Sequence, residues 1–321
     1  MALSHVQVET PMALVRAAAW SNSLARMGVH LPLFVVHDIG VMLSMTRGAG
    51  GYVIRAREAA VVHLLARAGI GVIMTSVRLL VLGLVVWSAT AMADTPSPLR
   101  VMTYNLNYAN PDVARTLDAI DAEDADVVLL QEIDAAWKRA LEKRFAKRYA
   151  HRSFHLHTRS PGGLGVLSKH PIDDERILPA PSGWFPASLL VVAGPFGALQ
   201  ILNVHLRPAI DNGSWVKGYF TTRPIRVREI KDYVSKLAAA LPTIIAGDFN
   251  EAPDGAAVDF LSRRGFTRAR TSGPSTWHYR DTLAMDIDHV MVNGNLVAKD
   301  AVVRDAGASD HRPVIVTVQP K

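Results

Sequence analysis

The octapeptide Thr243-Ile-Ile-Ala-Gly-Asp-Phe-Asn250 combines an apolar run, a glycine and two polar residues two positions apart. The run from Leu241 to Ala246 predicts a buried strand. Gly247 permits a turn or the close approach of a neighbouring chain. On an extended backbone Asp248 and Asn250 face the same way, so we expect both side chains in one space at the strand's carboxyl end. The alternative is an Asx turn that only closes the strand.

The same pattern, an apolar run that ends in polar residues, recurs along the chain. Further strands are predicted at 100–105, 126–132, 187–193, 199–206, 285–292, 297–303 and 314–318. The polar residues at or beside such ends are Asn105, Glu132, His205, Asp248, Asn250, Asp288, Asp310 and His311. Burying several carboxylates together is costly without a cation, so their recurrence indicates one shared site.

Helices are interspersed among the strands. The sequence predicts helices at 111–122, 134–149, 224–240 and 256–264, whereas 208–223 is expected to form a long loop. Strands dominate, and no repeat or low-complexity tract separates them. The pattern is typical of a layered α/β sandwich formed by one domain over residues 94–321.

The candidate ligands in this set offer mostly oxygen atoms, and the 321-residue chain contains no cysteine. Carboxylate and amide oxygens with little imidazole favour Mg²⁺ or Mn²⁺ over zinc. Histidines outside the ligand set remain available for proton transfer or for contact with phosphate. A metal, an in-line water and a base are what the hydrolysis of a phosphoric ester requires. The residues therefore suit a metal-assisted attack on phosphate.

The motifs also resemble those of a known family. In chain order they are Tyr104-Asn105, Gln131-Glu132, Gly165-Val-Leu-Ser-Lys-His-Pro-Ile172, Asn203-Val-His-Leu206, Gly247-Asp-Phe-Asn250, Ile287-Asp-His-Val290 and Ser309-Asp-His-Arg-Pro313. This order, spread over residues 100–318, resembles the endonuclease/exonuclease/phosphatase superfamily, which includes deoxyribonuclease I, exonuclease III-type repair nucleases and sphingomyelinases. The resemblance implies a four-layered α/β sandwich in which helices flank two mostly antiparallel β-sheets.

The resemblance further implies a metal centre that holds Mg²⁺ or Mn²⁺ as the cofactor. Glu132 resembles the principal metal ligand of the family. Asn105 and Asp310 match positions close to that metal. These three residues are the candidate metal-binding set.

A second group of residues would carry the catalytic step, again by resemblance. His311, oriented by Asp288, would act as a general base or as an electrostatic partner. Asp248 and Asn250 would position the attacking water and the phosphate. His205 would donate a hydrogen bond to a nonbridging phosphate oxygen.

Information about the substrate comes mainly from the segment 207–228, where basic and aromatic residues alternate. The candidate substrate-binding residues of this segment are Arg207, Trp215, Tyr219 and Arg223. This mixture favours nucleic acid, through phosphate contact and base stacking, but it also fits a lipid headgroup or ordinary loop packing. Trp277 is a further candidate, because it matches a place where members of the family carry aromatic residues near the substrate. The formal net charge is +6, of which residues 1–93 carry +4, so bulk charge does not indicate nucleic acid.

We therefore expect a divalent-metal-dependent phosphodiester hydrolase, with a nuclease as the first hypothesis. The alternatives within the superfamily are a phospholipid or sphingomyelin phosphodiesterase and a small-molecule phosphatase. An alternative of a different class is a membrane-tethered binder without catalytic activity. The substrate is the only partner that the sequence implies, and a monomer is expected.

Residues 74–93 have the features of a secretory signal peptide: a short positive start, an apolar segment and an A-x-A cleavage site at Ala91–Ala93. Translation is then expected to begin at Met74, and the protein to be periplasmic or secreted. Residues 1–73, which show no sustained helical or strand periodicity, would be a mis-assigned or disordered extension. The alternative is an uncleaved anchor at 69–92 in the inner membrane.

Overall fold

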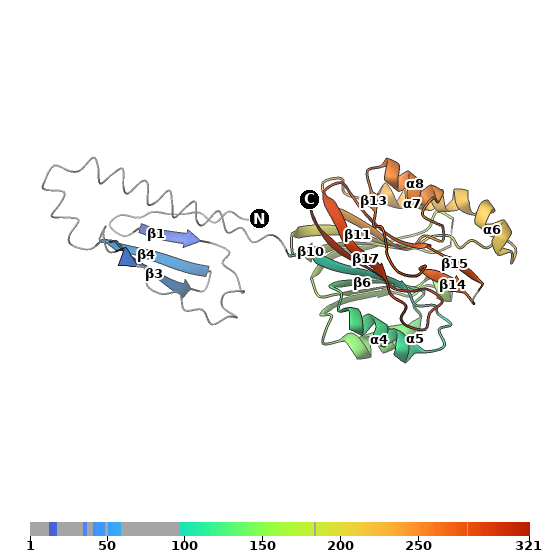
Figure 1. The fold of residues 1–321 in the computed structure, drawn as a ribbon, viewed down its shortest axis with the longest axis horizontal. Helices are drawn as coiled ribbons and strands as arrows, with labels where there is room; N and C mark the ends of the chain where they lie inside the picture. The colour runs from blue at the N-terminus through green and yellow to red at the C-terminus, as the bar shows by residue number, and fades with distance from the viewer. Residues whose placement is uncertain are drawn as a thin grey trace. The chain divides into compact units, whose positions relative to one another are not determined.

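The computed structural model describes residues 97–182, 184–280 and 282–321, except the side chains of Ser160, Trp215 and Tyr219, and the backbone of four strands within 13–58. The chain divides into two compact units, Met1–Thr95 and Pro96–Lys321, each held by its own contacts (Figure 1). The predicted signal peptide and the alternative membrane anchor lie outside the described residues. Within the described part, no helix is long and apolar enough to cross a membrane.

The first unit contains four described strands: β1 (Ala13–Ala17), β2 (Val35–Val36), β3 (Val41–Gly48) and β4 (Gly51–Glu58). They form an antiparallel sheet in the order β1-β4-β3-β2. The sequence predicts no strands here, because it shows no sustained strand periodicity. In the structure, β3 and β4 pair residue for residue along their length. The start of translation at Met74 stays a prediction.

Two six-stranded sheets form the second unit. The first sheet has the order β13-β16-β12-β11-β10-β9, and its strands are Thr267–Arg268, Asp288–Val292, Thr243–Asp248, Gly197–His205, Ala187–Gly194 and Ile172–Leu178. The second sheet has the order β17-β18-β5-β6-β8-β7, with strands Leu296–Val303, Val314–Pro320, Leu99–Asn105, Val127–Gln131, Leu164–Ser168 and His151–His155. Each sheet contains one parallel pair, β11 with β12 and β5 with β6, and its other pairs are antiparallel.

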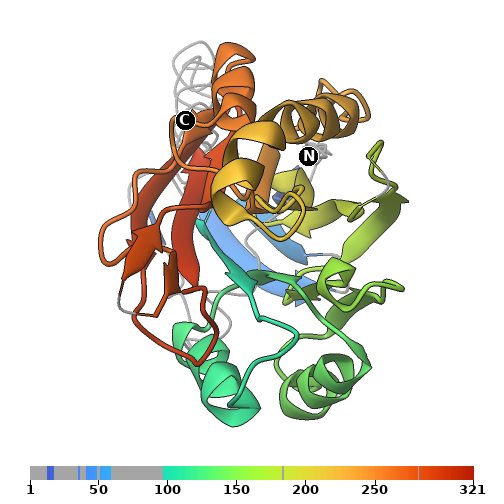
Figure 2. The same cartoon turned by 90° about the vertical axis from the view of Figure 1, so that its right-hand side faces the viewer.

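Helices cover the outer faces of both sheets (Figures 1 and 2). The helices α4 (Val113–Glu123) and α5 (Ala135–Phe145) pack on the second sheet, and α7 (Arg223–Val234) and α8 (Ala256–Arg263) pack on the first. The position of strand β6 explains why its sequence is an unbroken apolar run. Its alternate residues enter the core between the sheets and the core under the helices, so both faces are buried. The predicted four-layered sandwich is confirmed.

Gly247 is required by the parallel pairing of β11 and β12. It lies opposite Val204 with φ at +142°, and a Cβ at this position would stand 1.9 Å from the carbonyl oxygen of Val204. A side chain cannot be accommodated against a backbone at that distance. The glycine therefore allows β12 to approach β11 one residue before Asp248, where the strand ends.

Two elements differ from the sequence predictions. The expected loop 208–223 contains a short helix, α6 (Trp215–Thr221), because Ser214 caps its first turn by accepting from the amide of Lys217. The expected strand 285–292 is broken. Its first residue belongs to β15 (Leu283–Met285), which pairs with β14 (Trp277–Tyr279), whereas β16 pairs with β12. Asp288 therefore opens a separate strand of the first sheet.

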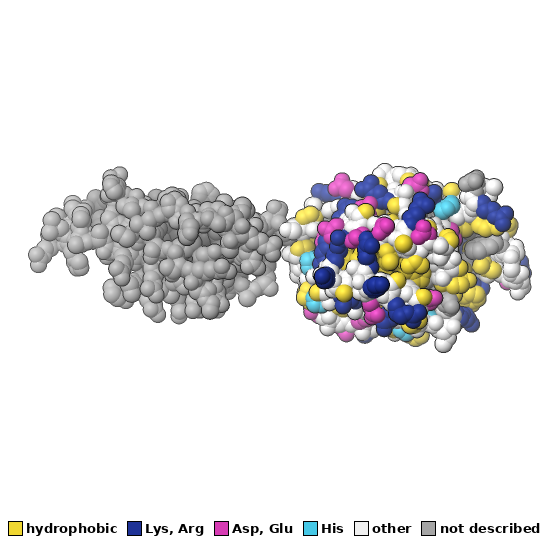
Figure 3. Space-filling model, turned by 90° about the horizontal axis from the view of Figure 1, so that it is seen from below, with side chains coloured by type: hydrophobic (Ala, Val, Ile, Leu, Met, Phe, Trp, Pro, Cys, Tyr) yellow, Lys and Arg dark blue, Asp and Glu magenta, His cyan; other side chains and the backbone are white. Residues whose placement is uncertain are grey.

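Charges of both signs are interspersed on the surface of the second unit (Figure 3). On the helical layer, Arg144 pairs with Asp118 and Asp121, with 2.8 Å between nitrogen and oxygen in each pair. These ion pairs neutralise part of the basic face of α5.

Candidate active site

The central parallel pairs bring the first four predicted residues together. Strand β5 ends at Asn105 and β6 is followed by Glu132, while β11 and β12 end at His205 and Asp248. The two sheets pack face to face, so the carboxyl ends of the two pairs meet. The amide of Asn105 joins them, because its Nδ2 donates to Glu132 Oε1 and to Asp248 Oδ2, both at 3.1 Å.

The C-terminal part of the chain adds a carboxylate and an imidazole. Asp288 opens β16, and His311 lies three residues before β18. His311 Nδ1 lies 2.9 Å from Asp288 Oδ2, and its Nε2 lies 3.7 Å from Asp248 Oδ2. Thr276 fixes the start of β16, since its hydroxyl accepts from the amides of Ile287 and Asp288 at 2.9 and 3.0 Å. The imidazole therefore links the two carboxylates.

Burial and charge set the protonation of this group. Burial lowers the pKa of His311, but the neighbouring carboxylates of Asp288 and Asp248 outweigh that effect and raise it to about 10. Burial raises the pKa of Asp248 to about 7, although the charge of His311 opposes the rise. Near neutral pH His311 is thus an imidazolium. Of the two roles implied by the sequence, this charge favours the electrostatic partner over the general base.

His205 lies on the other side of Asp248. Its Nε2 is 3.5 Å from Asp248 Oδ2 and 3.9 Å from Glu132 Oε1, and its Nδ1 is 3.0 Å from the carbonyl oxygen of Pro161. Burial, together with the charge of His311, lowers the pKa of His205 to about 3. A carbonyl only accepts, so the neutral ring carries its proton on Nδ1. Donation from Nε2 to a phosphate, as predicted, requires that an anionic substrate first favours the charged ring.

Asn250 does not extend the strand beyond Asp248. Its backbone lies in the left-handed region with φ at +52°, and its amide donates to Asp248 Oδ1 at 2.8 Å, which is an Asx turn. Its Nδ2 donates to the carbonyl oxygen of Leu206 at 3.1 Å. The expectation of an extended backbone was wrong here. The Asx turn uses one oxygen of Asp248 and leaves Oδ2 facing the histidines.

Asp310 lies at the edge of the group and is firmly held. Its Oδ1 accepts from Asn107 Nδ2 at 2.8 Å, and its Oδ2 accepts from Trp277 Nε1 at 3.1 Å. It is close enough to Glu132 for its charge to contribute to the raised pKa of that carboxyl, whose main cause is burial. Asp310 therefore lies near the predicted metal ligand Glu132.

The residues present fit a divalent cation. One carboxylate oxygen from each of Asp248 and Asp288 and one ring nitrogen of His311 lie within 4.8 Å of one another. Because the His311 ring is protonated near neutral pH, the carboxylates and not the ring would hold the cation. Glu132 and Asn105 adjoin this group through the hydrogen bonds to Asn105. The Oδ1 atom of Asp288 is buried and has no hydrogen-bond partner among the described residues, so that acceptor is unsatisfied by protein alone.

The predicted substrate-binding residues are more dispersed. The guanidinium of Arg207 donates to the carbonyls of Pro208 and Ile210 and lies 3.3 Å from the ring centroid of Trp184, so it holds its own loop. Arg223 is exposed and donates to the Asp254 carbonyl at 3.3 Å.

Of the three predicted aromatic residues, the structure describes the side chain of one. Trp277 is buried, and its ring nitrogen is already used by Asp310. The side chains of Trp215 and Tyr219 lie outside what the structure describes. Substrate contact by any of these residues stays a prediction.

Several residues at the site carry no signal that the sequence analysis used. Asn107 and Thr276 orient the aspartates through a side-chain amide and a hydroxyl, and Phe185 packs on His205 with 4.5 Å between ring centroids. Asn107 lies two residues beyond Asn105 in the Tyr-Asn motif, so the polar run after β5 could have indicated it. Nothing local singles out Thr276 or Phe185, because their roles depend on contacts with distant segments.

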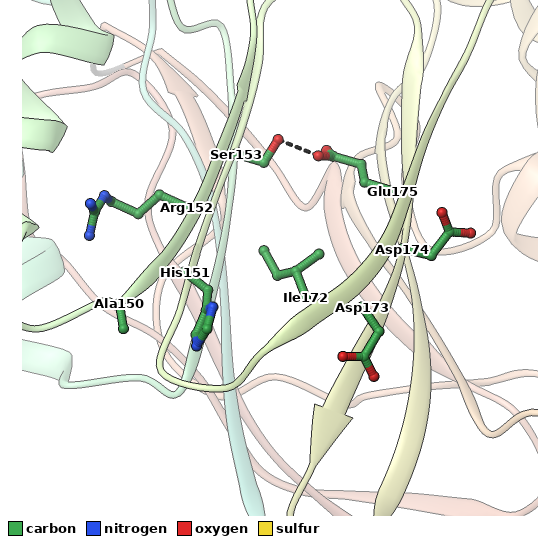
Figure 4. Close-up of a pocket in the computed structure, with 8 residues that line it drawn as sticks. All are labelled: Ala150, His151, Arg152, Ser153, Ile172, Asp173, Asp174 and Glu175. Carbon is green, nitrogen blue, oxygen red and sulfur yellow. Dashed lines mark hydrogen bonds between the residues drawn. The ribbon is translucent and has the colours of Figure 1, made fainter.

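A separate hollow of about 520 Å³ opens between the edge strands β7 and β9 (Figure 4). Its lining includes His151, Arg152 and the acidic run Asp173-Asp-Glu175. Ser153 donates to Glu175 across it, as the dashed line in Figure 4 shows. None of the predicted site residues lines this hollow, and the candidate active site is the group around Asp248.

His289 supports the site from behind. Its ring is buried, Nε2 lies 2.9 Å from the carbonyl oxygen of Glu251, and Phe249 packs edge-on with 5.3 Å between centroids. Burial lowers the pKa of His289 from 6.5 to about 4. The unfolded chain therefore binds a proton between these pH values that the folded chain excludes. Stability rises with pH across this window and is lost as the pH falls from 6.5 to 4.

We expect His289 to contribute about 3 kcal/mol to the loss of stability on acidification over this range. His289→Gln keeps a donor for the Glu251 carbonyl but cannot titrate, so its unfolding free energy should depend less on pH. Urea unfolding at pH 4, 5, 6 and 7 measures the effect, with half-buried His151→Gln as the control. Equal pH dependence in the native chain and the His289 variant would contradict the prediction.

Comparison with known proteins adds a family and a fold. A family profile described as the Endonuclease/Exonuclease/phosphatase family matches residues 102–311, more than half of the chain. A search of curated protein sequences finds no match.

Three solved structures illustrate the likeness of the fold. An endonuclease/exonuclease/phosphatase from Beutenbergia cavernae is 22% identical with a TM-score of 0.55, over 70% of this chain and 72% of that one. Sphingomyelinase C from Streptomyces griseocarneus is 18% identical with a TM-score of 0.54, over 68% and 99%. Humanized D. rerio TDP2 is 16% identical with a TM-score of 0.54, over 69% and 99%.

The profile match extends from β5 to His311 and includes all eight polar residues of the active-site prediction. The chain belongs to the endonuclease/exonuclease/phosphatase family, whose members are metal-dependent phosphoric ester hydrolases.

Proposed function

We propose that this chain hydrolyses phosphodiesters with a divalent cation, Mg²⁺ or Mn²⁺, and that a nuclease is the first candidate. The observation that carries the proposal is one continuous buried group, in which the Asn105 amide joins Glu132 to Asp248, and the His311 ring joins Asp248 to Asp288. Buried carboxylates at such spacing need compensating positive charge. A divalent cation would meet that need, and it would also attract the anionic phosphoryl group of the substrate.

The residues suit an in-line displacement by water. The water oxygen would form a bond to phosphorus while the bond from phosphorus to the leaving oxygen breaks. Asp248, with a pKa of about 7, would accept the proton of the water, and the His311 imidazolium beside it would stabilise negative charge on the phosphoryl oxygens, while the leaving oxygen takes its proton from solvent. Asp288 holds the ring in that position. A cation held by Glu132 and Asn105 would supply positive charge to the phosphoryl oxygens.

An aromatic pair supports the nuclease. The rings of Trp277 and Tyr279 are stacked, with 6.5 Å between centroids and 18° between planes. Trp277 donates a hydrogen bond to Asp310, and Tyr279 is half exposed, so the pair extends from the site to the surface. Such a platform suits the stacking of a nucleobase beside the scissile phosphate.

A second candidate is a phospholipid phosphodiesterase. Val216 and Phe220 on α6 are exposed apolar side chains on the segment that follows His205. Exposed apolar residues near a phosphodiesterase site suit a substrate that lies in a lipid surface. The fold likeness to a sphingomyelinase C supports this candidate at the level of architecture alone.

Hydrolysis assays on four substrates test the proposal. The purified chain with Mg²⁺ or Mn²⁺ is incubated with plasmid DNA, RNA, bis-p-nitrophenyl phosphate and sphingomyelin vesicles, and the His311→Ala chain is the blank. Nicking of DNA that is absent from the blank supports the nuclease. Cleavage of sphingomyelin without DNA cleavage supports the lipid enzyme. No hydrolysis of any of the four contradicts the proposed function.

The metal requirement gives a separate prediction. EDTA is expected to abolish hydrolysis, and Mg²⁺ or Mn²⁺ to restore it. Glu132→Gln keeps the shape of the side chain but removes a charge, so the half-saturating metal concentration should rise about tenfold or more. Initial rates against metal concentration measure it. The control is Glu142→Gln on α5, whose side chain is half exposed. An unchanged metal dependence in Glu132→Gln would remove this residue from the metal site.

A further inference from the structure

The most exposed large apolar side chains of the described residues gather on two neighbouring tips. Val216 and Phe220 of α6 are 76% and 67% exposed, and Tyr279 and Leu283 of the β14–β15 hairpin are each about half exposed. Figures 1 and 2 show α6 and this hairpin at the same end of the second unit. Single exposed apolar residues are ordinary, but a group of them indicates an interaction surface.

The local structure of α6 turns these side chains outward. Gly218 is buried against the preceding loop, where an added Cβ would lie 2.4 Å from the carbonyl oxygen of Ala209. Val216 and Phe220 are each two residues from Gly218, about 200° around the helix axis. They therefore lie on the face opposite the loop. The glycine holds the helix flat on the domain and presents an apolar face to solvent.

The same end of the unit is basic. Residues 211–228 contain four basic residues and one acidic one. Lys217, Arg223 and Arg228 are exposed, and Lys217 pairs with Asp211 at 3.2 Å, which leaves an excess of positive charge. On the hairpin, the guanidinium of Arg280 lies 5.2 Å from the ring centroid of Tyr279. Basic side chains around exposed apolar ones are typical of segments that lie at an anionic lipid–water interface.

Both tips are connected directly to the active site. The helix α6 begins ten residues after His205, and the loop between them supplies the carbonyl of Leu206 that holds Asn250. At the foot of the hairpin, Trp277 donates to Asp310 and pairs with His311 in a β-bridge. A surface that engages the tips would therefore lie next to the catalytic residues.

We propose that α6 and the β14–β15 hairpin form a docking surface for a phospholipid bilayer, which would present headgroup phosphodiesters to the site. Aliphatic side chains such as Val216 and Leu283 cannot stack on bases, and interfaces with nucleic acid are more polar and more basic than this one. The docking is independent of hydrolysis. Membrane phospholipid as the substrate class rests on the second candidate of the proposed function, the phospholipid phosphodiesterase, and would place it before the nuclease.

Because the chain has no cysteine, a single introduced cysteine can be labelled uniquely. Val216→Cys and Asn295→Cys, each in the full chain with His311→Ala to prevent turnover, are labelled with a polarity-sensitive nitrobenzoxadiazole dye. Asn295 is exposed in the turn after β16, whereas Asp288 at the start of that strand lies in the site. Vesicles of phosphatidylcholine and phosphatidylglycerol, with and without lipid-borne nitroxide quencher, are added to each protein.

We expect a blue shift and quenching of the dye at 216 and neither at 295, because only the tip enters the lipid. Because the dye reports only on its own surroundings, its signal at 216 does not depend on contacts that the N-terminal part of the chain makes with the vesicles. The proposal is overturned if the dye at 216 keeps its emission in water, or if both positions respond equally. It is also overturned if single-stranded oligonucleotide shifts the dye at 216 and vesicles do not.

A second variant links docking to activity. Val216→Glu in the otherwise native chain should lower hydrolysis of phosphodiesters in vesicles about tenfold and leave the rate on soluble bis-p-nitrophenyl phosphate unchanged. Asn295→Glu is the matched control and should change neither. Equal rates on vesicles for Val216→Glu and the native chain would count against the docking surface. No hydrolysis of plasmid DNA, RNA, the soluble ester or sphingomyelin by the native chain would instead reject the proposed function.

Discussion

Replacing His311 by alanine is expected to lower kcat for bis-p-nitrophenyl phosphate by about 10³-fold, with a smaller change in KM. The His311 ring lies between two carboxylates: its Nδ1 is 2.9 Å from Asp288 Oδ2, and its Nε2 is 3.7 Å from Asp248 Oδ2. Among the described contacts of the site, no other side chain joins these two residues. Its removal deletes the cationic partner of the phosphoryl oxygens and leaves two buried carboxylates without their positive neighbour. Both effects act on charge that develops in the transition state, so they should appear mainly in kcat.

The variant must be shown to be folded, because β18 begins three residues after His311. Circular dichroism and thermal unfolding provide that control, and His151→Ala, on the edge strand β7, provides a histidine substitution outside the site. We expect native-like spectra for both variants and native activity for His151→Ala alone. A His311→Ala chain that kept more than about a tenth of the native kcat would remove this residue from the mechanism.

Much of the fold could be predicted because the strands of a four-layered sandwich are buried on both faces. An unbroken apolar run such as Val127–Leu130 therefore identifies its strand without an alternating pattern. The same burial explains the site prediction. A carboxylate or histidine that directly follows such a run lies at the end of a buried strand, and two parallel pairs bring four such ends together.

The features that could not be predicted depend on pairing between distant segments. The strand expected at 285–292 breaks because Met285 pairs with Trp277 while Asp288 pairs with Asp248, and neither register is written in the local sequence. The edge strand β7, His151–His155, has no apolar pattern, since it is only half buried. The alternative prediction for the motif at Asn250 was an Asx turn that only closes the strand. The structure contains this turn, and Asp248 Oδ2 still faces His311 in the candidate active site.

The loops that follow His205 and Asp248 are joined by a buried ion pair that the sequence did not indicate. Arg226 Nε lies 3.0 Å from Glu251 Oε2, and both side chains are about 1% exposed. Glu251 directly follows Asn250, and its other oxygen accepts from the amide of Val258 at 3.4 Å in the first turn of α8.

The same guanidinium reaches the second loop. Arg226 also donates to the carbonyl of Arg207, two residues after His205, at 3.3 Å, and to the hydroxyl of Thr222 at 2.6 Å. One side chain therefore supports both loops of the site, and its loss affects their positions together.

Arg226→Met is expected to destabilise the chain by about 3–5 kcal/mol and to lower the Tm by about 10 °C. Methionine fills similar space, but it leaves the Glu251 carboxylate buried without a countercharge. Glu251→Gln in the same chain removes that charge and keeps an acceptor for α8, so the double variant should be more stable than Arg226→Met alone. A double-mutant cycle from urea unfolding gives the coupling energy, expected at about 1–3 kcal/mol. Arg263→Met, in an exposed pair with Asp259, is the matched control and should change stability by less than about 1 kcal/mol. Removing one partner of a buried ion pair leaves the other charge buried without a countercharge, which destabilises the fold. If Arg226→Met is no more destabilising than the Arg263→Met control, the buried pair does not hold the two loops.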